Sequence, residues 1–110
     1  MAYDEELAQR IRELLVDHPG VVEKRMFGGL AFLIGGNMSV AASGQGGLLV
    51  RCDPEESEAW LAEPHASSMV MRGRPMSGWL TVSSQGVASE ADLERWVRRG
   101  VTYAASLPSK

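Results

Sequence analysis

Two short apolar runs separated by paired glycines constrain the fold of this chain more than any other feature. The runs span residues 30–34 and 38–42, and the residues between them are Gly35, Gly36 and Asn37. A tight hairpin turn requires residues that accept a positive φ angle, so the two runs are expected to pair as antiparallel strands. This hairpin should form the centre of an antiparallel sheet.

A second glycine pair, Gly28-Gly29, interrupts the apolar pattern after residues 21–27. Glycines inside a strand indicate a bend, a bulge or the close approach of another backbone. A phosphate-binding loop would need a helix directly after the glycines, and none is predicted there. The strand pattern resumes over residues 48–52, which gives four strands in succession and predicts a meander.

A second hairpin is predicted further along the chain. Residues 69–71 and 78–82 are apolar, and they flank a basic connection over residues 72–76. This pattern indicates two more strands joined by a longer turn.

Two amphipathic helices are predicted before and between these hairpins. The first begins after Asp4, whose side chain can accept from free amides, and it ends before Pro19. The second is expected to begin at Pro54, because Asp53 can cap it and Glu56 can reach back to the capping residue.

A third helix completes the predicted fold. Ser89 and Asp92 form a capping pair, and an apolar stripe then continues to Ser106. The order helix, three or four strands, helix, two strands, helix predicts a two-layer α+β fold. Because each helix has one apolar stripe, the helices are expected on one face of a single antiparallel sheet.

Size and composition indicate one soluble, cytoplasmic domain over residues 1–110, with 45% hydrophobic residues. No apolar run approaches the roughly 18 residues that a membrane span needs. The single cysteine, Cys52, cannot form an intramolecular disulfide, and with His18 and His65 it is too few for a structural zinc site. No metal or cofactor is therefore expected. Cys52 shares its strand face with Val50, so we interpret it as a small buried hydrophobe.

The net charge of −3 is unevenly distributed along the chain. Residues 1–17 carry −3 and residues 53–63 carry −5, whereas residues 18–52 and 64–86 each carry +2. An acidic chain argues against indiscriminate nucleic-acid binding, because such binding depends on neutralising phosphates with Lys and Arg. Four arginines of the strand-rich segments are expected to form a modest patch that contacts an acidic partner or anion: Arg25, Arg51, Arg72 and Arg74.

Several short motifs occur in the order found in a known family. They are Lys24-Arg25-Met26-Phe27-Gly28-Gly29, Gly73-Arg74-Pro75-Met76, the stretch around Trp96, and Ser106-Leu107-Pro108. The chain resembles the N-terminal domain of the TfoX/Sxy competence regulators over nearly its whole length, and the Met-Phe-Gly-Gly box is the most specific motif. The resemblance implies a fold similar to that of secretion chaperones and, in some members, a link to transcriptional regulation of DNA uptake. Since the full regulators carry a second domain, this chain is expected to be a stand-alone single-domain member.

Three functions are compatible with these residues. The sequence places no nucleophile beside a base and no carboxylate pair, so we expect a non-enzymatic regulatory or protein-interaction module with an unidentified protein partner. Self-association as a homodimer is left open. The first alternative is a nucleic-acid-binding protein that uses Lys24 and the predicted arginine patch. The second is a small-ligand binder or enzyme that uses the glycine turn with Cys52 or His65.

Overall fold

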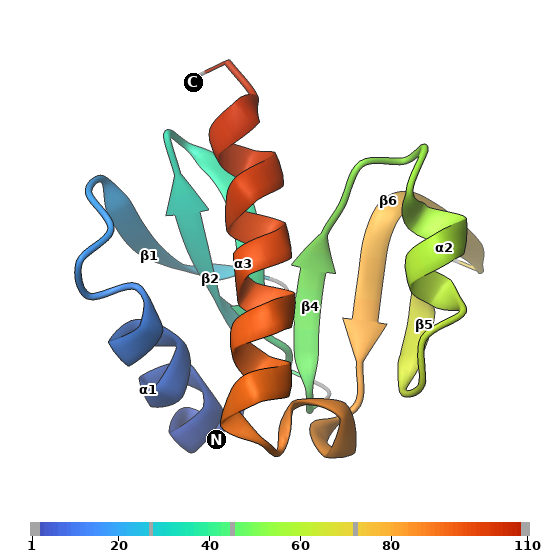
Figure 1. The fold of residues 1–110 in the computed structure, drawn as a ribbon, viewed down its shortest axis with the longest axis horizontal. Helices are drawn as coiled ribbons and strands as arrows, with labels where there is room; N and C mark the ends of the chain where they lie inside the picture. The colour runs from blue at the N-terminus through green and yellow to red at the C-terminus, as the bar shows by residue number, and fades with distance from the viewer. Residues whose placement is uncertain (1–2, 27, 45, 72, 109–110) are drawn as a thin grey trace.

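Six antiparallel strands form one sheet, in the order β1-β2-β3-β4-β6-β5 (Figure 1). The computed structural model describes residues 3–26, 28–44, 46–71 and 73–108. The strands are β1 (Val21–Met26), β2 (Gly29–Ile34), β3 (Asn37–Ala42), β4 (Leu48–Arg51), β5 (Ala66–Met71) and β6 (Arg74–Val82). The helices are α1 (Glu5–Leu14), α2 (Ser57–Leu61) and α3 (Glu90–Ser106), with a 3₁₀ turn at Ser84–Val87. The predicted α+β fold, with helices packed on one antiparallel sheet, is confirmed.

The glycine turn at the centre of the sheet is also confirmed. Gly35 and Gly36 have φ angles of 58° and 84°, and they place Ile34 of β2 opposite Asn37 of β3. Strands β1 to β4 form the predicted meander, and β6 pairs with β4. The second hairpin therefore extends the same sheet.

This second hairpin is longer than the sequence predicted. The apolar residues 69–71 and 78–82 indicated two short strands, but β5 begins at Ala66 and β6 begins at Arg74. Strand pairing needs only backbone groups, so the ladder continues beyond the apolar residues on both strands. Arg72 lies outside the described residues.

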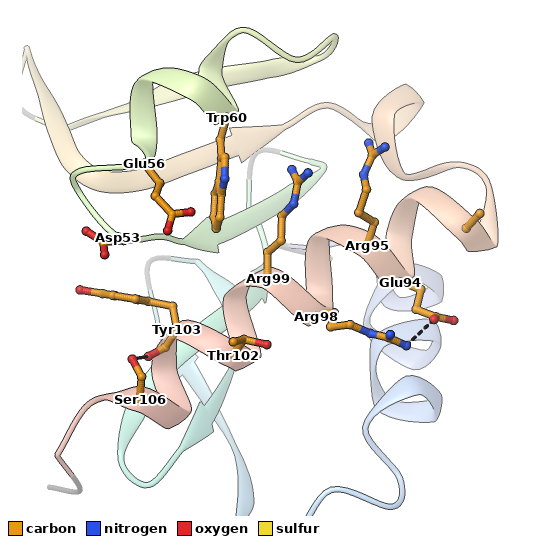
Figure 2. A pocket seen from close by; sticks show the side chains of 11 residues that line it. Asp53, Glu56, Trp60, Glu94, Arg95, Arg98, Arg99, Thr102, Tyr103 and Ser106 are labelled. Carbon is orange, nitrogen blue, oxygen red and sulfur yellow. Dashed lines mark hydrogen bonds and ion pairs between the residues drawn. The ribbon is translucent and has the colours of Figure 1, made fainter.

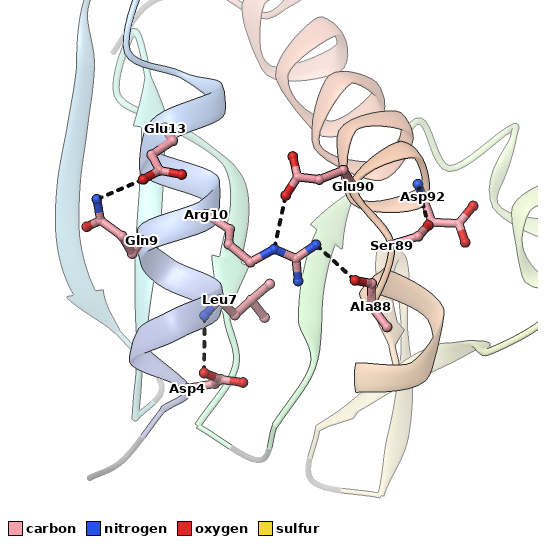
Figure 3. A network of polar contacts seen from close by, with 9 residues as sticks. All are labelled: Asp4, Leu7, Gln9, Arg10, Glu13, Ala88, Ser89, Glu90 and Asp92. Atoms are coloured by element: carbon pink, nitrogen blue, oxygen red, sulfur yellow. Dashed lines mark hydrogen bonds and ion pairs between the residues drawn. The ribbon is translucent and has the colours of Figure 1, made fainter.

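Helix α1 begins where the sequence predicted. The Asp4 carboxylate accepts a hydrogen bond of 3.1 Å from the Leu7 amide, which satisfies a free donor of the first turn. Figure 3 shows how Arg10 joins this helix to the start of α3. Its guanidinium donates to the Glu90 carboxylate and to the Ala88 carbonyl, each at 3.2 Å.

Helix α3 runs across the sheet and supplies much of the core. The Ser89 hydroxyl accepts from the Asp92 amide at 3.2 Å, which confirms the predicted cap. The Trp96 side chain is fully buried. Gly100 allows the helix to lie close to β3, since a Cβ there would come within 2.5 Å of the Ser39 carbonyl oxygen.

Helix α2 begins later than predicted, at Ser57 and not at Pro54. The Asp53 carboxylate accepts from the Glu55 amide at 2.9 Å, and the Asp53 carbonyl accepts from the Glu56 amide at 2.9 Å. These bonds close a turn that precedes the helix. The Asp-Pro capping signature is compatible with an isolated turn as well as with a helix start, and for this reason the predicted start was wrong.

The two faces of the sheet differ in what covers them. Side chains that point toward the helices form the main core, which includes the fully buried Phe32, Leu48, Leu80 and Trp96. A smaller cluster lies on the other side, which we call the open face. Its buried members are Ala31, Met38, Ala41 and Leu49, and Met26, Leu33, Met69 and Trp79 pack against them. Among the described residues, this cluster contains no member of a helix.

Candidate functional site

A groove of about 590 Å³ runs along the outer side of α3, between this helix and the α2 region (Figure 2). We call it the helix groove. Its lining combines aromatic rings with side chains of both charges. The rings are Trp60 and Tyr103, the arginines are Arg95, Arg98 and Arg99, and the carboxylates are Asp53, Glu56 and Glu94.

All three arginines of the helix groove form ion pairs. Arg98 donates to Glu94 at 2.6 Å, one turn away on α3. Glu63, which follows α2, contacts Arg99 at 2.6 Å and Arg95 at 3.4 Å. These bonds hold the α2 region against α3.

Aromatic packing also holds the α2 region against α3. The rings of Trp60 and Trp96 meet edge to face, with centroids 6.1 Å apart and an interplanar angle of 80°. The guanidinium of Arg99 lies 5.2 Å from the Trp60 ring centre and 4.7 Å from that of Trp96. Such contacts contribute roughly 0.5–1 kcal/mol each at partly exposed sites. We therefore interpret the polar side chains that line the helix groove mainly as contacts that hold the α2 region against α3.

A second groove, of about 480 Å³, lies on the open face of the sheet. We call it the open-face groove. Met26 of β1 and Met69 of β5 both line it, although these strands are the two edges of the sheet. The sheet must therefore curve toward its open face. Register shifts at Phe32–Leu33 and at Ser68–Val70 provide the irregularities that bend its strands.

The lining of the open-face groove is mixed, because Ser68 and Thr81 contribute hydroxyls beside the apolar Met26, Leu49 and Met69. The cluster next to it is apolar. Ala31, Ala41 and Leu49 lie opposite one another in β2, β3 and β4. Exposed valines extend this apolar surface toward both edges of the sheet, with Val22 57% exposed in β1 and Val70 61% exposed in β5. Methionine side chains adapt to irregular partners, so a surface of this kind suits contact with another molecule.

The Met-Phe-Gly-Gly box forms one end of this groove. Gly28 has a φ angle of 76°, which glycine adopts without strain, and it lies in the turn between β1 and β2. A Cβ on Gly29 would collide with the Ala42 carbonyl oxygen, and one on Gly44 would lie 2.6 Å from the Gly28 carbonyl oxygen. The glycines thus allow two turns to pack backbone against backbone, which is one of the alternatives that the sequence left open. Phe27 lies outside the described residues.

The second family motif shapes the turn between β5 and β6. Gly73 has a φ angle of 78°, Arg74 is the first residue of β6, and Pro75 and Met76 follow within the strand. The motif has a structural role in this hairpin, and its role in partner contact stays a prediction.

The sheet separates the arginines that the sequence grouped into one patch. Arg25 pairs with Leu30 in the ladder and so shares the side of the main core, at the edge strand β1. Arg51 lies in β4, with β2 and β3 between it and β1. Arg74 is exposed in β6, one strand further along, and Arg72 lies outside the described residues. Their contact with a partner or anion stays a prediction.

Lys24 lies on the open face, and Arg51 begins there. Lys24 pairs with Ala31, and Arg51 follows Leu49 by two residues, so both alternate to the side of the open-face cluster. The guanidinium of Arg51, however, lies 5.2 Å from the Trp79 ring centre and 5.7 Å from that of Tyr103 on α3, so it contacts residues from both sides of the sheet. Both cations were candidates from the sequence, but the apolar cluster of the open face was missed. The alternation of side chains along each strand could have indicated this cluster, but only when the register between the strands is known.

The residues that the sequence suggested for catalysis or ligand binding are Cys52 and His65. Cys52 is fully buried, and this burial, with smaller contributions from nearby carboxylates, raises the pKa of its thiol to about 11. His65 is exposed at the turn before β5. In the described part of the chain, no three His, Cys, Asp or Glu side chains are placed to hold a metal ion. No helix in that part is both long and apolar enough to cross a membrane.

One of three comparisons with known proteins found a match. No curated protein and no solved structure matches the chain. The family model of the TfoX N-terminal domain matches residues 13–104, which include all six strands, α2 and most of α3. The match covers most of the 110 residues, so the chain belongs to the TfoX N-terminal domain family.

Proposed function

We propose that this chain is a non-enzymatic protein-interaction module that acts in regulation in the cytoplasm, and that it contacts its partner through the open face. One observation carries the proposal: an apolar cluster with its own groove lies on the face of the sheet that helices do not cover. Membership of the TfoX N-terminal domain family supports a regulatory role. A role in the control of competence genes belongs to the same proposal.

The physical argument concerns the apolar surface of the open face. Removing apolar surface from water is favourable by roughly 25 cal/mol per Å², and this gain offsets the loss of freedom on association. The open face offers such surface in one place, at Leu33, Met69 and Trp79, which are partly buried by their own cluster and accessible from outside. The helix groove is less suited to this role, because its Arg95 and Arg99 bind Glu63 and so hold α3 to the α2 region of the same chain.

Site-specific photo-crosslinking in native cells tests the proposal. A photoreactive side chain at Val22, on the open face, is expected to give one discrete crosslinked protein, which mass spectrometry can identify. The matched position is Thr102, an exposed residue that lines the helix groove. Met69→Glu should weaken the Val22 crosslink, because it places a charge against the apolar cluster of the open face. Crosslinks from Thr102 alone, or none from Val22, would overturn the proposal.

Nucleic-acid binding is the second candidate, and the cations Lys24 on the open face and Arg51 at the end of β4 favour it. Titration of labelled duplex and single-stranded DNA separates the two functions. Binding to duplex DNA should weaken with salt at a log–log slope of about −0.9 per phosphate neutralised. We expect no binding at low salt. Salt-sensitive binding that Lys24→Glu with Arg51→Glu abolishes would favour the second candidate over the first.

A further inference from the structure

We infer that the helix groove binds an arginine-bearing segment of a partner protein, at the end of the groove that Glu56 and Tyr103 line. This contact goes beyond the proposed function, because the groove lies among the helices and not on the open face. The inference follows from three properties of the groove: the pairing of its charges, its aromatic rings and its length.

The charges that line the helix groove are only partly paired. Arg98 binds Glu94 within α3, and the other two arginines of the lining bind Glu63. The remaining carboxylates of the lining are Asp53 and Glu56, and among the described residues neither has an ion-pair partner. The unpaired charge of the groove is therefore negative, and it attracts a cation.

The two unpaired carboxylates lie at one end of the helix groove (Figure 2). They come from the turn between β4 and α2, where the Glu56 amide donates to the Asp53 carbonyl at 2.9 Å and holds the two residues together. The Asp53 carboxylate also accepts from the Glu55 amide through Oδ1. Its second oxygen and the exposed Glu56 carboxylate are available to a ligand from outside.

Aromatic rings complete this end of the groove. Trp60 and Tyr103 both line it and are both partly exposed. Each ring already holds a guanidinium of this chain, because Arg99 lies 5.2 Å from the Trp60 ring centre and Arg51 lies 5.7 Å from that of Tyr103. The faces of such rings attract cations. The rings and the unpaired carboxylates thus favour the same kind of ligand.

The shape of a guanidinium suits this surrounding better than that of an ammonium. A guanidinium is planar, so it stacks on aromatic rings, and its fork of N–H groups can bind a carboxylate through two hydrogen bonds. An ammonium is compact and strongly hydrated, and it makes neither contact as well. Arginine is therefore the expected side chain.

The length of the helix groove favours a peptide segment over a small cation. The groove volume of about 590 Å³ is typical of ligand sites. Its lining extends along α3 from Ala91 to Ser106, which is about 22 Å at 1.5 Å per residue. An extended peptide of about seven residues spans this length. A metal ion is a poorer occupant, because in the described part of the chain no three His, Cys, Asp or Glu side chains are placed to hold one.

A second copy of this chain is also a poorer occupant. Two helix grooves placed together would oppose the same unpaired carboxylates. An arginine from another surface of a second copy would make a head-to-tail contact, which leads to rings or filaments in place of a closed dimer.

Three synthetic peptides test the inference by fluorescence anisotropy and NMR. Each has about seven residues, and two central positions carry Arg, Lys or citrulline, the neutral isostere of Arg. At low salt we expect the Arg peptide to bind about tenfold more tightly than the citrulline peptide and about threefold more tightly than the Lys peptide. The advantage over citrulline should shrink as salt is raised. The indole N–H resonance of Trp60 should shift on binding, whereas that of Trp79 on the open face should not.

Charge variants assign the site. Asp53→Asn with Glu56→Gln removes both charges but keeps the side-chain carbonyls, and it should lower affinity for the Arg peptide about tenfold. It should leave affinity for the citrulline peptide unchanged. The matched control is Glu5→Gln with Glu6→Gln, which makes the same net change on exposed residues of α1 outside the groove. Thermal unfolding monitors the fold of each variant.

A ring variant and a smaller ligand test the other two properties. Tyr103→Leu should weaken binding and remove the preference for Arg over Lys, whereas Tyr103→Phe keeps the ring and should keep both. Free arginine amide should bind at least tenfold more weakly than the Arg peptide, because it lacks contacts along the rest of the groove.

The outcomes separate this inference from the proposed function. Equal binding of the Arg and citrulline peptides, no binding of any peptide, or a loss only in the control variant would overturn the inference. Equal binding of arginine amide and the Arg peptide would overturn the partner segment in favour of a small organic cation. The proposed function is decided separately, by crosslinking at Val22, so either can fail while the other stands.

Discussion

The two faces of this sheet are built from different side chains, although they belong to the same six strands. The helix-covered face buries large, rigid groups such as Phe32, Leu80 and Trp96 at 0–1% exposure. The centre of the open face is made of Ala31 and Ala41, with methionines around them. Large buried side chains contribute most to stability. The comparison indicates that one face carries the main core, whereas the other carries a small cluster that, among the described residues, only side chains of the sheet cover.

The charges follow the same division within a single strand. Glu23 and Lys24 are neighbours in β1 and point to opposite sides. Glu23 binds Arg12 of α1, whereas among the described residues Lys24 has no ion-pair partner. The acidic side chain therefore has a structural partner in this chain, and the basic side chain is available to another molecule.

The largest expected effect concerns the tryptophans of the two faces. Trp96→Ala should lower the free energy of unfolding by about 3–5 kcal/mol, because it leaves a cavity in the main core. Trp79→Ala on the open face should cost clearly less, since the side chain is only partly buried. Chemical denaturation of both variants measures the difference. Equal losses would show that the open face contributes as much as the covered one.

The next effect is the protection of Cys52 on the covered face. A thiol pKa of about 11 lies roughly two units above an ordinary thiol, so the reactive thiolate should be about a hundredfold scarcer at neutral pH. Native labelling by a thiol reagent should be slow and should become fast in denaturant. The matched control is Val22→Cys with Cys52→Ala, which places one thiol on the open face. Rapid labelling of Cys52 in the native protein would contradict its burial in the main core.

A smaller effect tests how closely α3 lies on β3. Alanine is better than glycine in a helix by about 1 kcal/mol, so propensity alone predicts that Gly100→Ala is stabilising. A Cβ within 2.5 Å of the Ser39 carbonyl should instead force the layers apart, at a cost of about 1–3 kcal/mol. We expect net destabilisation in thermal unfolding. The exposed Ala105→Gly, in the same helix, measures the propensity term alone.

Local patterns predicted most of the fold correctly. The caps at Asp4 and Ser89 and the turn at Gly35 depend on neighbouring residues, and all three occur as predicted. The start of α2 was predicted wrongly, because the same local signature at Asp53 also forms an isolated turn. Patterns within a few residues determine a cap or a turn, but not whether a helix continues beyond it.

The candidate site depends on long-range pairing, which composition could not provide. The sequence indicated that bases gather in the strands, and Lys24 and Arg51 were recognised among them. Their common face could be assigned only from the register of β1 and β4 with their neighbours. Arg25 lies one residue from Lys24 and points to the other side. A shift of one residue reverses the side of every side chain, so grouping by sequence segment could not separate them.

The smallest expected effect concerns the ion pair between Arg12 and Glu23 on the covered side. Two hydrogen bonds from Arg12, at 2.6 and 2.8 Å, chiefly lower the pKa of the Glu23 carboxyl. A lowered folded-state pKa stabilises the fold above the ordinary glutamate pKa of about 4.3, and this contribution is lost as pH falls through the folded-state value. Because both side chains are partly exposed, Arg12→Gln should cost only about 0.3–1 kcal/mol at pH 7. The difference from the unaltered protein should vanish in acid, whereas Lys24→Gln on the open face should leave stability unchanged at either pH. A loss for Lys24→Gln as large as that for Arg12→Gln would mean that both faces use their charges to stabilise the fold, and the division between the faces would fail.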